Sequence, residues 1–141
     1  MQRVVAEPLV YEFSRHLEPR VTIQPGESVV VESEDALSGQ LKTSHDRRDK
    51  STVPKSNPVA GPILVEGAEP GDALAVTIQE IRSRDGQAAT YTGHPGRLAE
   101  WLGSEEPSGA RICPIRDGQV YWNEQTPIPF APMLGCLGTA P

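Results

Sequence analysis

The sequence has 141 residues, enough for one domain whose core needs no disulfide or metal to hold it together. Its formal net charge of −6 argues against non-specific nucleic-acid binding, which needs a basic face. No apolar run reaches the roughly 18 residues of a transmembrane helix, and residues 1–7 have no signal-peptide pattern. We therefore expect a cytoplasmic protein that binds neither nucleic acid nor membrane.

The first predicted strand covers residues 21–23, where Val21 and Ile23 alternate with polar neighbours. Pro25-Gly26 then leads into a second apolar strand at residues 29–31. The order of Pro-Gly, acid and apolar strand returns at residues 70–76. Pro followed by Gly is typical of a type II turn, because Pro fixes φ at the first central position and Gly accepts positive φ at the next. This echo predicts β-structure but, by itself, no chemistry.

Three acids follow the second strand: Glu32, Glu34 and Asp35. Strand alternation places Glu32 and Glu34 on one face and Asp35 on the other. Carboxylates are ligands for hard and borderline metals, so a metal contact is one interpretation. A charged strand end facing water is the other.

Residues 38–58 form a long polar loop with many charges and few apolar side chains. A loop of this length inside a compact domain is usually functional or mobile, although a solvated excursion explains the composition equally well. The three histidines, His16, His45 and His94, are scattered and do not indicate a metal site.

Glu66 ends a predicted apolar strand at residues 61–65 and shares a face with Leu64. Two small residues, Gly67 and Ala68, follow it and leave space for a ligand. An exposed strand end is the alternative.

Further alternation predicts a half-buried strand with Leu74, Val76 and Ile78 on one face. Ile81 breaks the alternation, which indicates a β-bulge near residues 79–80.

Two Asp-Gly pairs, Asp85-Gly86 and Asp117-Gly118, predict hairpin turns. The second is the clearer case and joins residues 110–115 to residues 119–122. Between the two pairs, residues 97–102 favour a short helix, which Gly103 would end.

The two cysteines, Cys113 and Cys136, lie far apart in the sequence. In a reducing compartment we expect buried thiols rather than a disulfide. The frequent turns and short strands predict a single all-β domain over residues 1–141, a β-sandwich of jelly-roll type with one short helix. Phosphate-binding loops, dinucleotide fingerprints, nucleophile elbows and CxxC pairs are absent from the sequence.

Three segments, in the same order, resemble the hallmarks of the acetamidase/formamidase family. Residues 57–72 are similar to its N-P-x-T/A-G-P-x-x-V-x-G-A-x-P-G-D pattern. Residues 23–40 contain a Pro-Gly-Glu turn and then Glu34-Asp35 and Gly39-Gln40, similar to its D-x-x-x-G-Q segment. Residues 132–141 are similar to its P-M-I-G-x-I-G-x-A-P pattern, so the likeness extends over residues 15–141.

The resemblance implies a jelly-roll β-sandwich that hydrolyses short linear amides, such as formamide or acetamide, with a divalent metal ion, zinc or calcium. On this likeness Asp35 is the candidate for a metal or water contact, Glu66 for the base or a neighbour of the metal, and Asn57 for orienting a carbonyl or holding its loop. A bound cation would polarise the amide oxygen or activate a water molecule, and a carboxylate would take the proton. Glycines in the matched segments are expected to permit tight turns or close approach: Gly67, Gly71, Gly135 and Gly138.

The family's next hallmark, G-x-H-G-G-N-x-D, has no match in this sequence. We therefore expect a C-terminal half or a partner subunit to supply the rest of the site, and apolar side chains near Met133, Leu134 and Leu137 to be uncovered. We also expect a homo-oligomer. The alternative function is a non-catalytic β-sandwich module for binding or assembly, derived from the same family.

Overall fold

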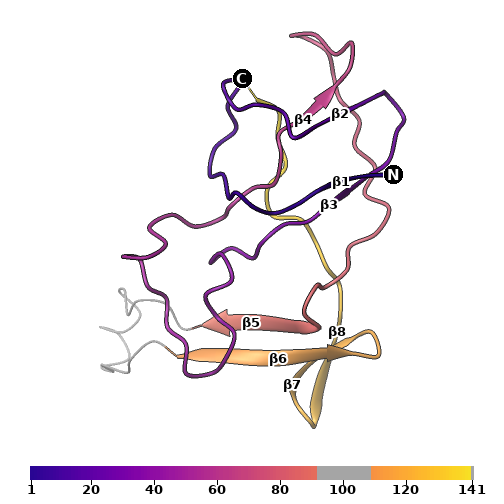
Figure 1. The fold of residues 1–141 in the computed structure, drawn as a ribbon. Helices are drawn as coiled ribbons and strands as arrows, with labels where there is room; N and C mark the ends of the chain where they lie inside the picture. Colours follow the sequence, from indigo (N-terminus) through magenta and orange to yellow (C-terminus); the bar gives the residue numbers. More distant parts are fainter. Residues whose placement is uncertain (92–108, 141) are drawn as a thin grey trace. The chain divides into compact units, whose positions relative to one another are not determined.

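The computed structural model describes residues 1–91 and 109–140, and their regular structure consists entirely of β-strands (Figure 1). The all-β prediction is therefore confirmed. The predicted short helix at residues 97–102 lies outside the described residues. Within the described part of the chain, no helix is long and apolar enough to cross a membrane.

The chain divides into two compact units. Unit 1 contains Met1–Gly39, Lys50–Gln79 and Leu134–Pro141, and unit 2 contains Gln40–Asp49 and Glu80–Met133. The prediction of one domain stays a prediction, and each unit is described by itself below.

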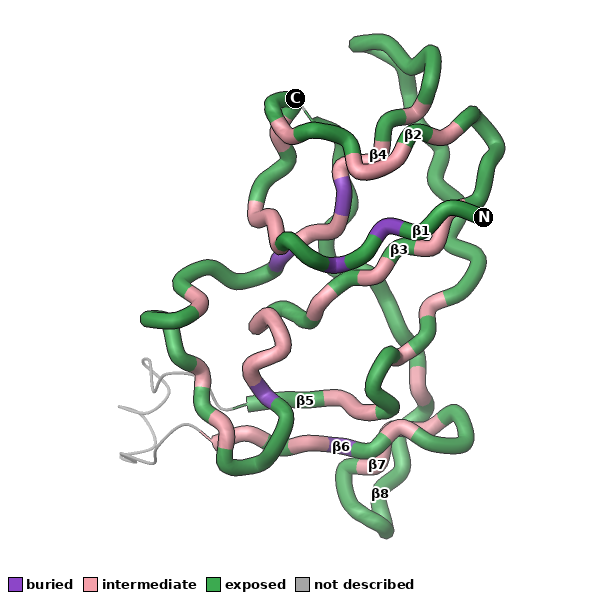
Figure 2. Tube along the Cα trace, in the orientation of Figure 1, coloured by how far each residue is buried: buried purple, intermediate pink, exposed green. Residues whose placement is uncertain are grey.

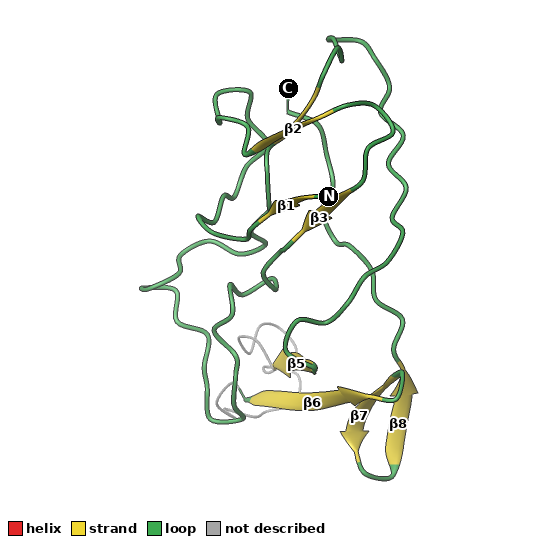
Figure 3. Cartoon of the chain, turned by 45° about the vertical axis from the view of Figure 1, so that its right-hand side comes forward, coloured by secondary structure: helices red, strands yellow, loops and turns green. Residues whose placement is uncertain are grey.

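Unit 1 is built on two short parallel strand pairs (Figure 3). Strand β1 (Gln2–Val4) pairs with β3 (Val29–Val31), and β2 (Val21–Ile23) pairs with β4 (Ile63–Val65). Parallel pairing requires a long crossover between partners, and here the connections are loops rather than helices among the described residues. The predicted strands at residues 21–23 and 29–31 are confirmed, as is the end of the predicted 61–65 strand.

The two Pro-Gly segments form matching turns in unit 1. The Glu27 amide donates to the Gln24 carbonyl at 3.1 Å, and Gly26 has φ of +85°. The second turn repeats this arrangement, with the Asp72 amide 3.0 Å from the Glu69 carbonyl. In each turn the closing acid also accepts a hydrogen bond from the first residue's amide, at 2.7 Å for Glu27 and 2.9 Å for Asp72. The sequence echo therefore has a local structural counterpart.

Arg20 holds the segment that follows β1. Its guanidinium donates to the carbonyls of four consecutive residues, at 2.7 Å for Val5 and 3.2 Å for both Ala6 and Glu7, with Pro8 the fourth. These carbonyls have no ladder partner, so Arg20 supplies the donors that a strand would otherwise provide.

Unit 2 contains a four-stranded antiparallel sheet in the order β5-β6-β7-β8. The strands are β5 (Gln87–Tyr91), β6 (Ala110–Arg116), β7 (Gln119–Asn123) and β8 (Thr126–Pro129). Each strand pairs with the next one in the sequence, which makes this a meander; short turns connect β6 to β7 and β7 to β8.

The Asp117-Gly118 hairpin is confirmed. Asp117 and Gly118 have φ of +51° and +70°, and Arg116 pairs directly with Gln119. Positive φ at both central residues belongs to a type I′ turn, whose twist matches that of the flanking strands. Asp85-Gly86 also turns the chain, but only the strand after it, β5, forms, so the first hairpin prediction is wrong.

The strand predicted around Leu74, Val76 and Ile78 is also wrong. No strand, turn or bend is present at residues 73–80, and the three side chains are 48%, 61% and 49% exposed. The alternation is real, but a strand also needs a neighbour to hydrogen-bond with, and no described segment pairs with this one. Without a strand there is no bulge at residues 79–80.

Few of the described residues are buried (Figure 2). Within the described residues, Val4 and Ala6 are buried in unit 1, and Leu41 and Cys113 in unit 2. Both cysteines are free thiols, as predicted, but only Cys113 is buried; Cys136 is exposed.

Apolar side chains near the end of the chain are uncovered, as predicted. Met133, Leu134 and Leu137 are all exposed. Gly138, in the same segment, lies against Phe13, because a Cβ built on it would come within 3.2 Å of the ring. The predicted close approach is thus found at Gly138, and positive φ is found at Gly67 and Gly71, whereas Gly135 shows neither.

Candidate functional site

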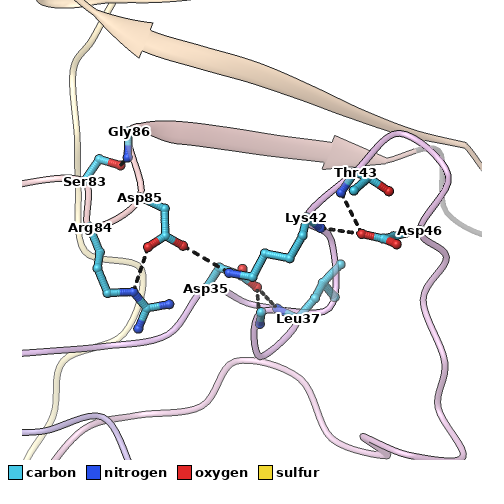
Figure 4. Close-up of polar contacts among 10 residues, drawn as sticks. Asp35, Leu37, Lys42, Thr43, Asp46, Ser83, Arg84, Asp85 and Gly86 are labelled. Atoms are coloured by element: carbon cyan, nitrogen blue, oxygen red, sulfur yellow. Dashed lines mark hydrogen bonds and ion pairs between the residues drawn. The ribbon is translucent and has the colours of Figure 1, made fainter.

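Asp35 closes a tight turn directly after β3 (Figure 4). Its Oδ1 accepts hydrogen bonds from the backbone amides of Leu37 at 2.7 Å and Gly39 at 3.2 Å. Its own carbonyl accepts from the Ser38 amide at 2.9 Å, and Ser38 has φ of +56°. An aspartate that bonds the backbone two residues ahead is a common turn device. Asp35 is an exposed residue, and Oδ1 accepts both of these hydrogen bonds.

Asn57 lies beside this turn. The Asn57 amide donates to the Ala36 carbonyl at 2.8 Å, and Asn57 has φ of +58°. Asparagine tolerates this left-handed conformation better than most residues, which explains its place at a bend of the chain. The structure therefore bonds Asn57 to Ala36, the residue next to Asp35, although Asp35 and Asn57 are 22 positions apart in the sequence. We call this meeting point the Asp35–Asn57 junction.

Glu66 has a different environment. Its amide donates to the Ile23 carbonyl at 2.9 Å, which extends the β2–β4 ladder by one bond. Its Oε2 accepts a hydrogen bond from Nε2 of Gln24, and the side chain is exposed. Gly67, with φ of +77°, then completes a turn between Val65 and Ala68. Glu66 therefore forms its described polar contacts with the β2 end rather than with the junction.

The acids at residues 32–35 do not gather with other ligands into a group of three within the described structure. Glu32 forms an ion pair with Arg3 at 2.5 Å, which occupies its carboxylate across the β1–β3 pair. Among residues 1–91 and 109–140, no three His, Cys, Asp or Glu side chains gather in a way that could hold a metal ion.

Unit 2 contains a polar cluster that the sequence did not single out (Figure 4). Asp85 forms ion pairs with Arg84 and with Lys42, each at 3.1 Å, and the hydrogen bond from Arg84 is the main cause that lowers the pKa of Asp85, with Lys42 next. Asp46 accepts the backbone amides of Lys42 and Thr43, both at 2.6 Å, and these bonds lower its pKa.

Only part of this cluster had a sequence signal. A run of Thr, Ser and Asp favours local bonds to the backbone, so the turn around Asp46 could have been predicted. Lys42 and Asp85 are 43 positions apart, and no local pattern links them.

A shallow cavity of about 500 Å³ opens beside the same loop. Its lining includes Lys42, Thr43 and Ser44 from the loop and Arg111 from β6. The Arg111 guanidinium stacks on the Trp122 ring at 4.1 Å, and it donates to the Trp122 carbonyl at 3.1 Å. Both cations at this cavity already have partners, because Lys42 pairs with Asp85 and Arg111 contacts Trp122.

Comparison with known proteins decides the family. The family model described as "Acetamidase/Formamidase family" matches residues 6–141. The chain belongs to the acetamidase/formamidase family. The resemblance found in its three sequence segments is thereby confirmed.

Individual relatives agree with this assignment. The chain is 35% identical over 127 residues to a predicted formamidase of Schizosaccharomyces pombe, a match that covers 85% of this chain and 31% of the relative. It is 40% identical over 63 residues to an acetamidase of Mycolicibacterium smegmatis, which covers 43% of this chain and 15% of the relative.

Solved structures show the same likeness. A crystal structure of a predicted acetamidase/formamidase from Thermoanaerobacter tengcongensis matches with a TM-score of 0.85 and 32% identity, over 99% of this chain and 46% of that one. An acetamidase from Bacillus halodurans matches with a TM-score of 0.76 and 26% identity, with the same coverage. The jelly-roll part of the fold prediction rests on the family likeness. This chain spans 31% of the length of the Schizosaccharomyces pombe relative and 46% of the length of each of the two solved structures.

Proposed function

We propose that this chain contributes to an amidase that hydrolyses short linear amides, of the formamide or acetamide type, to ammonia and a carboxylate. Family membership and the names of its relatives support this reaction class. Because the chain covers less than half of the relatives' length, we further propose that a C-terminal half or a partner subunit supplies the remaining active-site residues.

The observation that carries the proposal is the Asp35–Asn57 junction. Asp35 belongs to one family-like segment and Asn57 to another, and the 2.8 Å bond between the Asn57 amide and Ala36 joins them. A carboxylate with one oxygen fixed by backbone amides, on an exposed residue, is suited to orienting a water molecule. The Asn57 side chain, which is exposed, offers an amide to orient the substrate carbonyl.

Glu66 is the proposed base. Amide hydrolysis adds water to the carbonyl carbon, breaks the C–N bond, and transfers the water proton to the departing ammonia. Glu66 would take that proton and return it, while Gln24 holds one of its oxygens in place. Glu66 reaches the reacting atoms only if the complete enzyme places the substrate between it and the Asp35–Asn57 junction.

A divalent metal, zinc or calcium, is implied by the family resemblance, and such an ion polarises carbonyls and activates water. The described residues do not assemble three donors for it. We therefore derive no step through a metal, and propose Asp35 as the donor that this chain would add to ligands supplied from elsewhere.

The test is ammonia release from formamide and acetamide by the chain co-expressed with the remaining polypeptide. Glu66→Gln should lower kcat by about 10²- to 10⁴-fold, the range for loss of a general base. Glu69→Gln is the matched control, because Glu69 is an exposed acid in the neighbouring turn. Full activity of the Glu66→Gln enzyme would rule out the assigned role, and absence of any amide turnover would rule out the proposed reaction.

A non-catalytic binding or assembly module is the second candidate. The observation in its favour is the lack of a three-donor metal cluster among the described residues. It predicts that the co-expressed complex contains no stoichiometric metal and releases no ammonia. The amidase proposal predicts a bound metal and the release of ammonia. Elemental analysis together with the ammonia assay separates the two.

A further inference from the structure

Residues 73–79, here called the 73–79 segment, have no backbone partner among the described residues; a turn precedes them and one side-chain hydrogen bond holds their last residue. The turn before it is closed by the 3.0 Å bond from Asp72 to Glu69 and by the 2.9 Å bond from the Glu69 amide to the Asp72 carboxylate. At the other end, the Gln79 side chain donates to Ser28 Oγ at 3.1 Å. Both anchors lie within unit 1.

Between its anchors, the segment has the features of a strand without a neighbour. It contains no turn or bend, and no backbone hydrogen bond joins it to another described segment. Its three large apolar side chains alternate along the chain and are about half exposed or more. At about 3.3 Å per residue, seven residues would give roughly 23 Å of strand edge.

Natural proteins rarely leave a strand edge of this length uncovered. Natural proteins protect exposed edges with Pro, Lys, bulges or very short strands, because unpaired amides and carbonyls attract other chains. The 73–79 segment has no Pro and no charge. The turn before the segment and the hydrogen bond at its last residue lower the entropy lost when a partner strand docks, which favours strand addition.

We propose that the 73–79 segment is a docking site for a β-strand of the polypeptide that completes the family's length, an inference that rests on the proposed function. The solved relative from Thermoanaerobacter tengcongensis matches 99% of this chain but has more than half of its own residues outside the match. That additional polypeptide is the occupant of the surface. The paired strand would bury the Leu74, Val76 and Ile78 side chains, and would restore the strand that their alternation predicts.

The charges at the ends of the segment argue against a second copy as the occupant. Antiparallel self-pairing centred on Val76 would place Asp72 opposite Glu80 at both ends, and like charges directly opposite each other are destabilising. Glu80 already pairs with Arg82 at 2.6 Å, so the acid that favours a basic residue in the partner strand is Asp72.

The experiment uses the 141-residue chain co-expressed with a defined probe, the part of the Thermoanaerobacter tengcongensis relative that lies outside the match. Val76→Lys should weaken binding of the probe by about tenfold or more, because the complex would bury a charge. Val5→Lys is the matched control, since Val5 is also a valine of unit 1 and is 51% exposed. Neither variant should change the stability of the chain alone by more than about 0.5 kcal/mol, as for other exposed positions.

Hydrogen exchange gives an independent measurement. Backbone amides of residues 73–79 should exchange rapidly in the chain alone and slowly in the complex, while those of β7 should not change. Absence of a complex, equal binding by Val76→Lys and Val5→Lys, or a self-associated dimer that Val76→Lys disrupts would each overturn the proposal. A Val76-dependent complex without amide turnover would sustain the docking site and reject the proposed function.

Discussion

Asp35 allows its structural and functional roles to be tested separately. The carboxylate accepts two backbone amides, at 2.7 and 3.2 Å, through Oδ1 alone. Asp35→Ala removes both bonds. Each is worth about 0.5–1.5 kcal/mol net, and solvent replaces them partly at this exposed site, so we expect a loss of about 1–2 kcal/mol.

Asp35→Asn keeps an oxygen acceptor in the same position and removes the charge. The turn should therefore persist, with unfolding free energy within about 0.5 kcal/mol of the unmodified chain. If the charge contacts metal or water in the complete enzyme, as proposed, the same variant should lose amide hydrolysis by at least about 10²-fold.

Urea unfolding of the chain alone gives the first comparison, and ammonia release by the co-expressed complex gives the second. Equal destabilisation by Ala and Asn would refute the assignment of the turn to Oδ1. Unchanged ammonia release by Asp35→Asn, at unchanged stability, would show that Asp35 serves only the backbone.

Three further predictions follow from the described contacts. Val4 is 1% exposed and Val5 is 51% exposed. Val4→Ala should lower the free energy of unfolding in urea by about 2–3 kcal/mol, and Val5→Ala should lower it by less than about 0.5 kcal/mol. Gly118→Ala should cost about 1–2 kcal/mol, because Gly118 has φ of +70°, whereas Gly135→Ala, at an open position, should be tolerated. Hydrogen bonds from two backbone amides lower the pKa of Asp46, so its contribution to stability is complete above the ordinary value of 3.8 and is lost as pH falls through the lower folded-state pKa. Asp46→Asn should remove that part of the pH dependence of the unfolding free energy. An unaltered pH profile would contradict the assignment.

The candidate site could be predicted only in part. Motif likeness predicts Asp35, Asn57 and Glu66, and the structure links Asn57 to the backbone beside Asp35. This link is one backbone bond between Ala36 and Asn57, for which neither residue type is required, so no residue pattern could reveal it. The ion pair between Lys42 and Asp85 could not be predicted from the sequence for a related reason. Either charge could pair with many others, and only the fold brings these two within 3.1 Å.

Local chemistry explains what the sequence alone determined. The two Pro-Gly turns and the Asp117-Gly118 turn form as predicted because their φ values are properties of two adjacent residues. Pairing is different, since a strand is stabilised by hydrogen bonds to a neighbour that can lie far away in the chain. Tertiary structure therefore decided that β2 pairs with β4, 42 positions further along the chain. It also decided that the alternating residues Leu74, Val76 and Ile78 form no strand in the described structure, because no neighbour reaches their backbone.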